Sequence, residues 1–280
     1  MPTTSKKVPA PKLFGILNIT EDSFSDGGQY LDFEKAVAHG HDLMGAGADV
    51  LDIGPASSHP KSKPVSAAEE IKRITPVVKA FGDAQIPVSI DTFQTETQRF
   101  ALHQGVAYLN DIQGFADPTF YPELADADVK LVVMHAVQQR GPATLVETAP
   151  DEIWGRIERF FDDRVAALEK AGVNRDRLIL DPGMGFFLGT DMEVSFEVLR
   201  NLGRLRGRYG LPILVSVSRK SFLRKVTGRP LTEMAAATLA SELFVAATGS
   251  DFIRTHDPAA LRDGLKVWSA LGQLPPLQDT

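Results

Sequence analysis

The chain has 280 residues, 43% of them hydrophobic and 24% charged, so it can bury the core of one large α/β domain or two small ones. Its net charge of −6 and the lack of a long basic run argue against nucleic acid or an anionic membrane surface as a partner. There is no cysteine, which excludes disulfides, thiolate zinc sites and a cysteine nucleophile. No apolar run reaches the about 18 residues of a membrane span, so we expect a cytoplasmic protein.

Eight apolar runs are typical of buried strands, and each is followed by a helical pattern or a helical turn. The strands are predicted at residues 13–17, 49–51, 88–90, 107–109, 130–134, 177–180, 212–217 and 252–253. Helices are predicted at residues 32–46, 66–81, 94–103, 118–124, 151–171, 193–205, 232–248 and 261–271. The runs are nearly continuous rather than alternating, as expected for strands that are buried on both faces.

Eight strand–helix units in this length predict a closed (β/α)₈ TIM barrel spanning residues 13–272 as a single catalytic domain. Residues 1–12 form a polar, basic stretch that we expect to be a flexible arm, and residues 273–280 are a tail. A doubly wound open sheet is the competing fold. We disfavour it because no Gly-x-Gly-x-x-Gly pattern follows the first strand.

Polar or charged residues end all eight predicted strands. They are Asn18, Asp52, Asp91, Asn110, His135, Asp181, Lys220, Arg254 and His256. Closure of a barrel brings the carboxyl ends of its strands to one mouth, where active sites lie. The carboxylates and the amide suit a flat heterocycle with ring N–H and amino groups, whereas the cationic side chains suit a phosphate or diphosphate. Asn18 could share a Mg²⁺ ion with that phosphate.

Nine short motifs in order resemble dihydropteroate synthase. They are Ile16-Leu17-Asn18-Ile19-Thr20, Asp22-Ser23-Phe24-Ser25-Asp26-Gly27-Gly28, Asp52-Ile53-Gly54, Ser89-Ile90-Asp91-Thr92, Asn110-Asp111-Ile112, Met134-His135, Asp181-Pro182-Gly183, Ser218-Arg219-Lys220-Ser221 and Arg254-Thr255-His256. The resemblance implies condensation of 6-hydroxymethyl-7,8-dihydropterin diphosphate with p-aminobenzoate, giving 7,8-dihydropteroate and pyrophosphate in folate synthesis.

The resemblance also assigns roles to the strand-end residues. Pterin binding is implied for Asp91, Asn110, Met134, Asp181 and Lys220, and we take Asp91, Asp181 and Lys220 as the catalytic candidates. Diphosphate binding is implied for Asn18, Arg254 and His256, with Mg²⁺ as the cofactor and Asn18 as its ligand. The arylamine is itself the nucleophile, so the site needs leaving-group stabilisation and a carboxylate near the developing cation more than a strong base.

The p-aminobenzoate pocket is implied to include residues from several loops. They are Phe24, Ser58, Pro60, Phe186, Phe187, Ser218 and Arg219, and the loops at residues 20–31 and 55–65 are expected to close over the site. The family is dimeric, and the alanine-rich helix at residues 234–247 has two crowded faces, so we expect a homodimer. A helix buried within one chain would have the same pattern.

The sequence departs from the usual family pattern near the p-aminobenzoate pocket. His59 and Gln113 stand where arginines are common, and the turn after Asp181 is about two residues longer than usual. These features resemble the sulfonamide-insensitive branch, which carries a Phe-Gly-type insertion in this turn. We hypothesise that Phe187 crowds the part of a sulfonamide that extends beyond the outline of p-aminobenzoate, while sparing the smaller substrate.

Three alternatives remain open on the sequence alone. A methyltransferase-type barrel that binds methyltetrahydrofolate would share the pterin-binding carboxylate and amide, but it has no diphosphate to hold with Lys220 and His256. A Schiff-base lyase would use Lys220, whose neighbour Arg219 could lower its pKa. A non-catalytic pterin-binding paralogue is disfavoured by the full set of strand-end residues.

Overall fold

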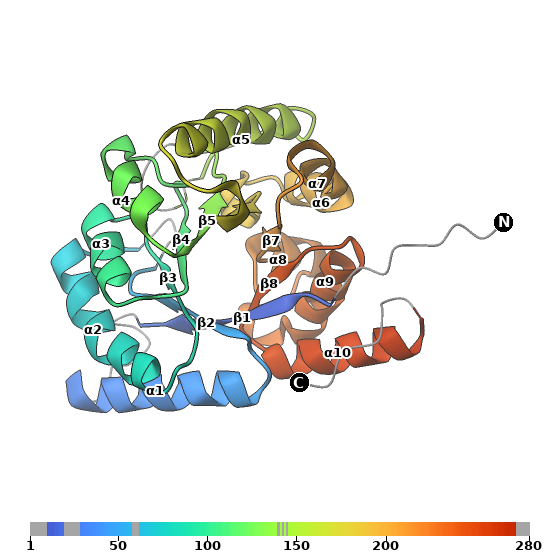
Figure 1. The fold of residues 1–280 in the computed structure, drawn as a ribbon. Helices are drawn as coiled ribbons and strands as arrows, with labels where there is room; N and C mark the ends of the chain where they lie inside the picture. Colours follow the sequence, from blue (N-terminus) through green and yellow to red (C-terminus); the bar gives the residue numbers. More distant parts are fainter. Residues whose placement is uncertain are drawn as a thin grey trace.

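A computed structural model describes residues 10–19, 29–57, 62–138, 141, 143 and 145–272, with the backbone alone for residues 29–32. Viewed as in Figure 1, the helices form a ring around a central set of strands and follow one another in chain order. The predicted arm falls mostly outside the described residues, and the predicted tail at residues 273–280 lies wholly outside them.

Eight parallel strands form the barrel that the sequence predicts. They are β1 (Lys12–Asn18), β2 (Val50–Gly54), β3 (Val88–Asp91), β4 (Tyr108–Asp111), β5 (Lys130–Met134), β6 (Leu178–Asp181), β7 (Leu214–Val215) and β8 (Phe252–Thr255). Their order is β6-β5-β4-β3-β2-β1-β8-β7, and a parallel bridge between Leu180 and Ile213 joins the two outer strands. The competing open sheet is therefore wrong.

One apolar layer fills the part of the barrel interior that is nearer the amino ends of the strands. It consists of Phe14, Val50, Tyr108, Val132, Ile179, Leu214 and Phe252. Side chains of a strand alternate between two faces, so the residue two positions further along each strand also points inward. These second positions are Ile16, Asp52, Asn110, Met134, Asp181, Ser216 and Arg254, and they form the floor of the site. The apolar layer therefore lies directly next to a mainly polar one, in which Ile16 and Met134 are the apolar members.

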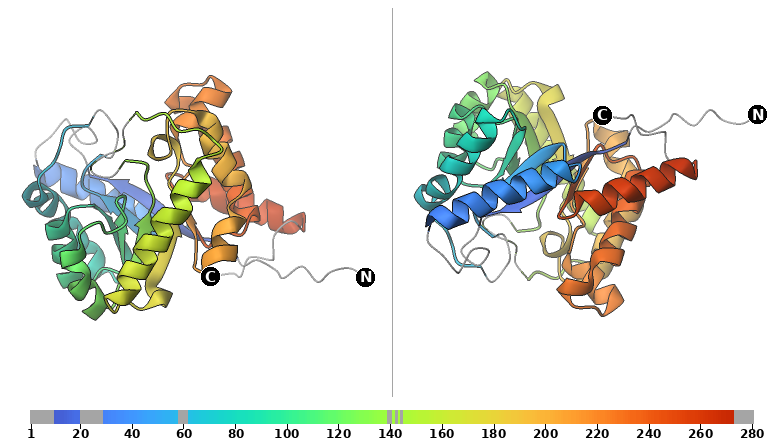
Figure 2. Two further views of the ribbon diagram at one scale, coloured as in Figure 1. Left: turned by 90° about the horizontal axis from the view of Figure 1, so that it is seen from above. Right: turned by 90° about the horizontal axis from the view of Figure 1, so that it is seen from below.

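Ten α-helices are present in the described part of the chain. They are α1 (Gln29–Gly45), α2 (Ala67–Asp83), α3 (Thr95–His103), α4 (Tyr121–Asp126), α5 (Ile153–Lys170), α6 (Met192–Arg200), α7 (Gly203–Tyr209), α8 (Ser221–Thr227), α9 (Ala235–Ala247) and α10 (Pro258–Ala270). The right-hand view in Figure 2 places α1 and α10 together on one side, as expected where β1 pairs with β8.

Two helix predictions need correction. The helix predicted at residues 193–205 is divided into α6 and α7, because the Asn201 side chain donates to the Glu197 carbonyl and ends the first helix. Helix α8 was not predicted, since its seven residues are too short to give a helical pattern. Ser66 caps the amino end of α2, because its hydroxyl accepts from the Glu69 N–H over 3.3 Å.

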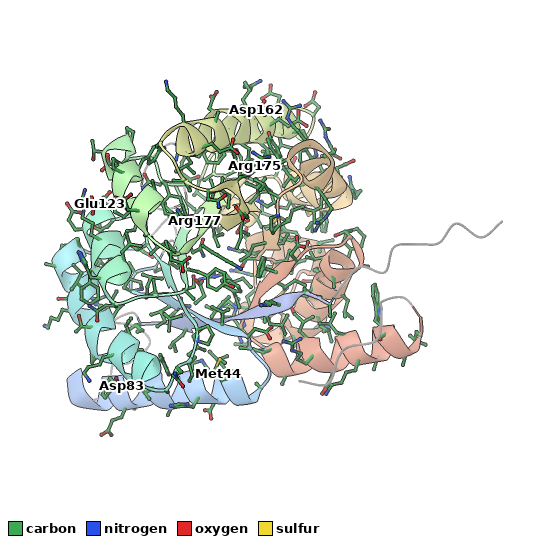
Figure 3. All side chains as sticks on the ribbon, in the orientation of Figure 1. Met44, Asp83, Glu123, Asp162, Arg175 and Arg177 are labelled. Carbon is green, nitrogen blue, oxygen red and sulfur yellow. The ribbon has the colours of Figure 1, made fainter. Side chains whose placement is uncertain are left out.

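Arginine side chains join neighbouring elements of the barrel away from the site. Arg177, labelled in Figure 3, precedes β6 and donates to the carbonyls of Leu124 and Ala127 at the end of α4. Asp162 on α5 accepts from Arg208 on α7 over 2.6 Å. These contacts lie away from the strand ends that carry the site. Among the described residues, no helix is long and apolar enough to cross a bilayer.

Candidate active site

Arg254 lies between two carboxylates at the mouth of the barrel. Its Nε donates to Asp52, and its Nη2 donates to Asp91 over 2.7 Å. The Asp52 side chain is fully buried, and Asn110 Nδ2 lies 3.4 Å from the same carboxylate. Within the described residues, Asp52 Oδ1 and Asn110 Oδ1 are buried without a hydrogen-bond partner. Such atoms are costly unless something completes them, so this part of the site suits ligand N–H groups.

Asp181 lies at the end of β6 and accepts a hydrogen bond from the Gly183 N–H over 2.8 Å. Only glycine fits at position 183, because φ is +74° and a Cβ atom there would lie 2.3 Å from the His135 carbonyl oxygen. Burial raises the pKa of Asp181 to about 6. Burial also raises the pKa of Asp91 to about 7, although Arg254 opposes this shift. Both carboxyl groups therefore hold protons more tightly than exposed ones do.

Lys220 supplies a second cation near these carboxylates. Burial lowers the pKa of its amine to about 8, and Arg254 acts in the same direction, whereas Asp181 and Asp91 favour the charged form. The Nζ atom lies 5.2 Å from the centroid of the Phe187 ring, within the range of a cation–π interaction. The amine is therefore mostly charged at neutral pH and is held above an aromatic face.

Ser218 follows β7 and His256 follows β8, and the two side chains contact each other. The Ser218 hydroxyl lies 2.9 Å from His256 Nδ1 and accepts from the His256 backbone N–H over 3.3 Å. Burial lowers the pKa of His256 to about 3, and the nearby cations Arg219 and Arg254 add to this shift. The sequence predicts a cationic donor at His256, whereas the lowered pKa favours a neutral ring. It would therefore offer a phosphate a neutral N–H.

Asn18 ends β1 at the rim of the site with an exposed side chain. A Cβ atom at Gly54 would lie 3.1 Å from Asn18 Oδ1, so glycine at this position leaves room for the amide. Within the described residues, no group of three or more His, Asp or Glu side chains could hold a metal by itself. A Mg²⁺ ion that takes most of its ligands from phosphate and water fits the single amide oxygen.

Two adjoining cavities contain the predicted site residues. The smaller is lined by the whole predicted pterin set, Asp91, Asn110, Met134, Asp181 and Lys220, together with Phe187 and Arg254. The larger has a volume of about 460 Å³, and its lining includes Asn18, Phe186, Phe187, Ser218, Arg219 and His256. The strand ends thus converge as the barrel requires. Phe24, Ser58 and Pro60 lie outside the described residues, as do residues 20–28 and 58–61 of the two predicted closing loops.

Sequence reasoning missed Ser216 and gave no role to Asp52. Ser216 lines both cavities, and its buried hydroxyl has no hydrogen-bond partner in the described part of the chain. The alternation of Val215, Ser216, Val217 and Ser218 could have identified it, because residues two apart share a strand face.

His135, by contrast, lines neither cavity and has a structural role. Its ring is 2% exposed, and Nδ1 lies 3.0 Å from the Pro182 carbonyl oxygen. Burial lowers the pKa of His135 to about 4. A neutral ring that donates from Nδ1 satisfies this contact, so His135 holds the turn that follows Asp181.

We expect His135→Asn to reduce the loss of stability in acid. His135 binds more protons in the unfolded chain than in the native state between pH 4 and 6.5, so its contribution lowers the free energy of unfolding by about 3 kcal/mol as the pH falls through this window. Asparagine does not titrate and can still donate to Pro182. Urea unfolding at pH 7 and pH 4.5 measures the difference. The control is His103→Asn, at an exposed position. If the unfolding free energy of His135→Asn fell as much between pH 7 and pH 4.5 as that of the unaltered chain, the prediction would be wrong.

Comparison with known proteins shows the family of the chain. Residues 14–256 match the family model described as "Pterin binding enzyme". The Escherichia coli dihydropteroate synthase type-2 is 57% identical, with 92% of this chain and 95% of that protein covered. The dihydropteroate synthase of E. coli strain K12 is 32% identical, with 95% and 94% covered.

Solved structures agree as well. The Xanthomonas albilineans dihydropteroate synthase, solved with 4-aminobenzoic acid, superposes with a TM-score of 0.87 at 36% identity, covering 96% of this chain and 95% of that one. The match with the family model extends over most of the barrel, from β1 to the end of β8. The chain therefore belongs to the dihydropteroate synthase family, whose members are transferases of folate biosynthesis.

Proposed function

We propose that the chain condenses 6-hydroxymethyl-7,8-dihydropterin diphosphate with p-aminobenzoate, giving 7,8-dihydropteroate and pyrophosphate. The observation that carries this proposal is the convergence of Asp91, Asn110, Met134, Asp181 and Lys220 on one small cavity. The adjoining larger cavity holds Ser218, Lys220 and His256, which suit phosphate oxygens. A methyltetrahydrofolate-binding barrel would have no use for that second set.

The electrostatics suit departure of pyrophosphate before attack by the amine. Asp52, Asp91 and Asp181 lie near the two cations Arg254 and Lys220, so negative charge is available to stabilise a cationic pterin methylene. In the structure Arg254 is held by Asp52 and Asp91. Its remaining N–H groups, with Lys220, would stabilise the leaving diphosphate.

Mg²⁺ fits the chemistry of this rim as a partner of the diphosphate. Asn18 would hold the ion through its amide oxygen, and when bound the ion would neutralise charge on the leaving pyrophosphate. The protein itself binds and orients the substrate through His256 and Lys220.

Pyrophosphate release from dihydropterin diphosphate, measured with Mg²⁺ while p-aminobenzoate is titrated, tests the proposed reaction. Release that requires p-aminobenzoate supports the synthase. If the chain binds methyltetrahydrofolate and releases no pyrophosphate, the proposal is wrong. Adding borohydride with a carbonyl substrate tests the lyase alternative, in which Lys220 would be trapped covalently.

We expect Asn18→Leu to raise the Mg²⁺ concentration needed for half-maximal pyrophosphate release by about tenfold, the effect of one lost polar ligand. Leucine has a similar size but no oxygen. Titration of Mg²⁺ at saturating substrates gives the value. Asn174→Leu, at an exposed position before the amino end of β6, is the control. Equal Mg²⁺ dependence in Asn18→Leu and the unaltered chain would mean that Asn18 is no ligand.

Insensitivity to sulfonamides belongs to the same proposal. The chain is 57% identical to the type-2 enzyme of E. coli and 32% identical to that of strain K12, so it is more similar to the type-2 relative. Phe187 lines both cavities from the turn that follows β6. An aromatic ring at the border between the two cavities supports the steric hypothesis for drug exclusion.

A homodimer and a cytoplasmic location complete the proposal. Phe244 on α9 and Val267 and Leu271 at α10 are 42%, 57% and 66% exposed, and α9 packs against α10. Exposed apolar side chains on two adjoining helices suit an interface. We expect Phe244→Glu to convert a dimer into a monomer, as measured by light scattering, with Lys266→Glu as the control. A monomeric unaltered chain would contradict the prediction.

Cell fractionation tests the proposed cytoplasmic location.

A further inference from the structure

Helix α9 directs two buried polar side chains, Thr238 and Glu242, toward the end of the barrel that carries the site. They are four residues apart and therefore share one face of the helix. Thr238 is 6% exposed and Glu242 is 1% exposed. Neither lines the two site cavities. Buried polar groups of this kind require a structural or functional reason.

Glu242 is hydrogen-bonded to Thr255, the last residue of β8. The Thr255 hydroxyl also accepts from the Asp257 N–H over 3.1 Å. Strand alternation points Thr255 outward, toward α9, whereas Arg254 and His256 on either side of it line the larger cavity. The Thr255 hydroxyl, which Glu242 holds, thus bonds the backbone directly after His256.

Thr238 supports the neighbouring loop. Its hydroxyl accepts from the Arg219 N–H over 3.3 Å. Arg219 has φ of +59°, a left-handed conformation that residues other than glycine rarely adopt and that needs support from its surroundings. The preceding residue is Ser218, which contacts His256. Both α9 side chains therefore act on the same edge of the larger cavity.

The protonation state of Glu242 suits a place behind an anion site. Burial raises its pKa to about 8, Asp257 acts in the same direction, and Thr255 and Arg219 oppose the shift. Glu242 Oε1 is buried without a hydrogen-bond partner among the described residues. A neutral carboxyl group holds Thr255 without placing a negative charge behind the diphosphate.

We propose that Glu242 is a positioning residue for diphosphate binding, which acts through Thr255 on the backbone of His256, next to the support that Thr238 gives to Arg219. The inference rests on the proposed function, because it takes His256 to contact the diphosphate. Glu242 itself would touch no substrate atom.

Equilibrium binding of two ligands tests the inference. One ligand is the dihydropterin diphosphate with Mg²⁺, and the other is 6-hydroxymethyl-7,8-dihydropterin, which lacks the phosphates. Glu242→Met and Thr255→Val each remove the hydrogen bond while keeping most of the volume. For both variants we expect the Kd of the diphosphate ligand to rise about tenfold, the effect of one lost hydrogen bond. The Kd of the unphosphorylated pterin should stay within about twofold.

Two further variants complete the experiment. Glu242→Gln keeps a donor and an acceptor for Thr255 and should bind both ligands as the unaltered chain does. Ser241→Ala is the control on the same helix, because the Ser241 hydroxyl bonds the Ala237 carbonyl of α9 itself.

The outcomes separate the inference from the function on which it rests. If Glu242→Met and Thr255→Val bind the diphosphate ligand with an unchanged Kd, or if the Kd values of both ligands rise equally, Glu242 does not position the anion site. If the unaltered chain binds the two ligands with equal affinity, the proposed diphosphate site is wrong instead.

Discussion

Replacing Asp181 by asparagine should lower kcat/KM for the dihydropterin diphosphate by about 10³-fold and leave the chain folded. The carboxyl group is 3% exposed and lines the smaller cavity, where a pterin would meet it. Asparagine has the same shape and can still accept from the Gly183 N–H, which now donates over 2.8 Å. It cannot supply negative charge to a developing pterin cation, and the loss of one such preorganised group typically costs 10²–10³-fold.

The matched control for this variant is Asp176→Asn. Asp176 is exposed and lies in the short turn before β6, at the opposite end of the same strand. Steady-state pyrophosphate release and thermal unfolding are measured for both variants. We expect Asp176→Asn to match the unaltered chain in both. If Asp181→Asn kept kcat/KM within about tenfold of the unaltered value, this carboxylate would not stabilise the transition state.

The sequence was sufficient to predict the barrel and most of the residues that line its mouth. Continuous apolar runs separated by helical patterns have few architectures available, and parallel closure then places every strand end on one face. Asp91, Asn110, Asp181 and Lys220 were predicted to converge, and they do line one cavity. The period of two along a strand also identifies the inward-facing residue that follows the apolar layer, although it was not applied to Ser216.

Contacts between distant side chains could not be predicted in the same way. Arg254 bonds Asp52, which lies 202 positions earlier in the chain, and no local pattern encodes that pairing. The neutral state of His256 depends on burial and on cations from other strands. Glu242 appeared as one polar residue in an alanine-rich helix, so that its contact with Thr255 became visible only in three dimensions.

Phe187→Ala is expected to make the enzyme sensitive to sulfonamides, with a fall of about 10–100-fold in their inhibition constant, as found for hydrophobic pockets that gain or lose a large group. The ring is 6% exposed and lies in the turn after β6, whose end is held by the bond from the Val137 N–H to the Phe187 carbonyl over 2.8 Å. It packs with Met134 and Ala143 and lines both cavities. A sulfonamide extends further than p-aminobenzoate, so removing the ring opens space that only the drug requires.

Two variants from the same turn separate this effect from a general loss of packing. Phe187→Ala also removes buried contacts and should cost about 3 kcal/mol of unfolding free energy. Leu188→Ala, at a fully buried position outside both cavities, should cost a similar amount and leave sulfonamide inhibition unchanged. Phe186→Ala tests the neighbouring ring, which lines the larger cavity alone. If sensitivity appears with Phe186→Ala rather than Phe187→Ala, the excluding side chain is Phe186, and if neither variant responds, the steric hypothesis for this turn fails.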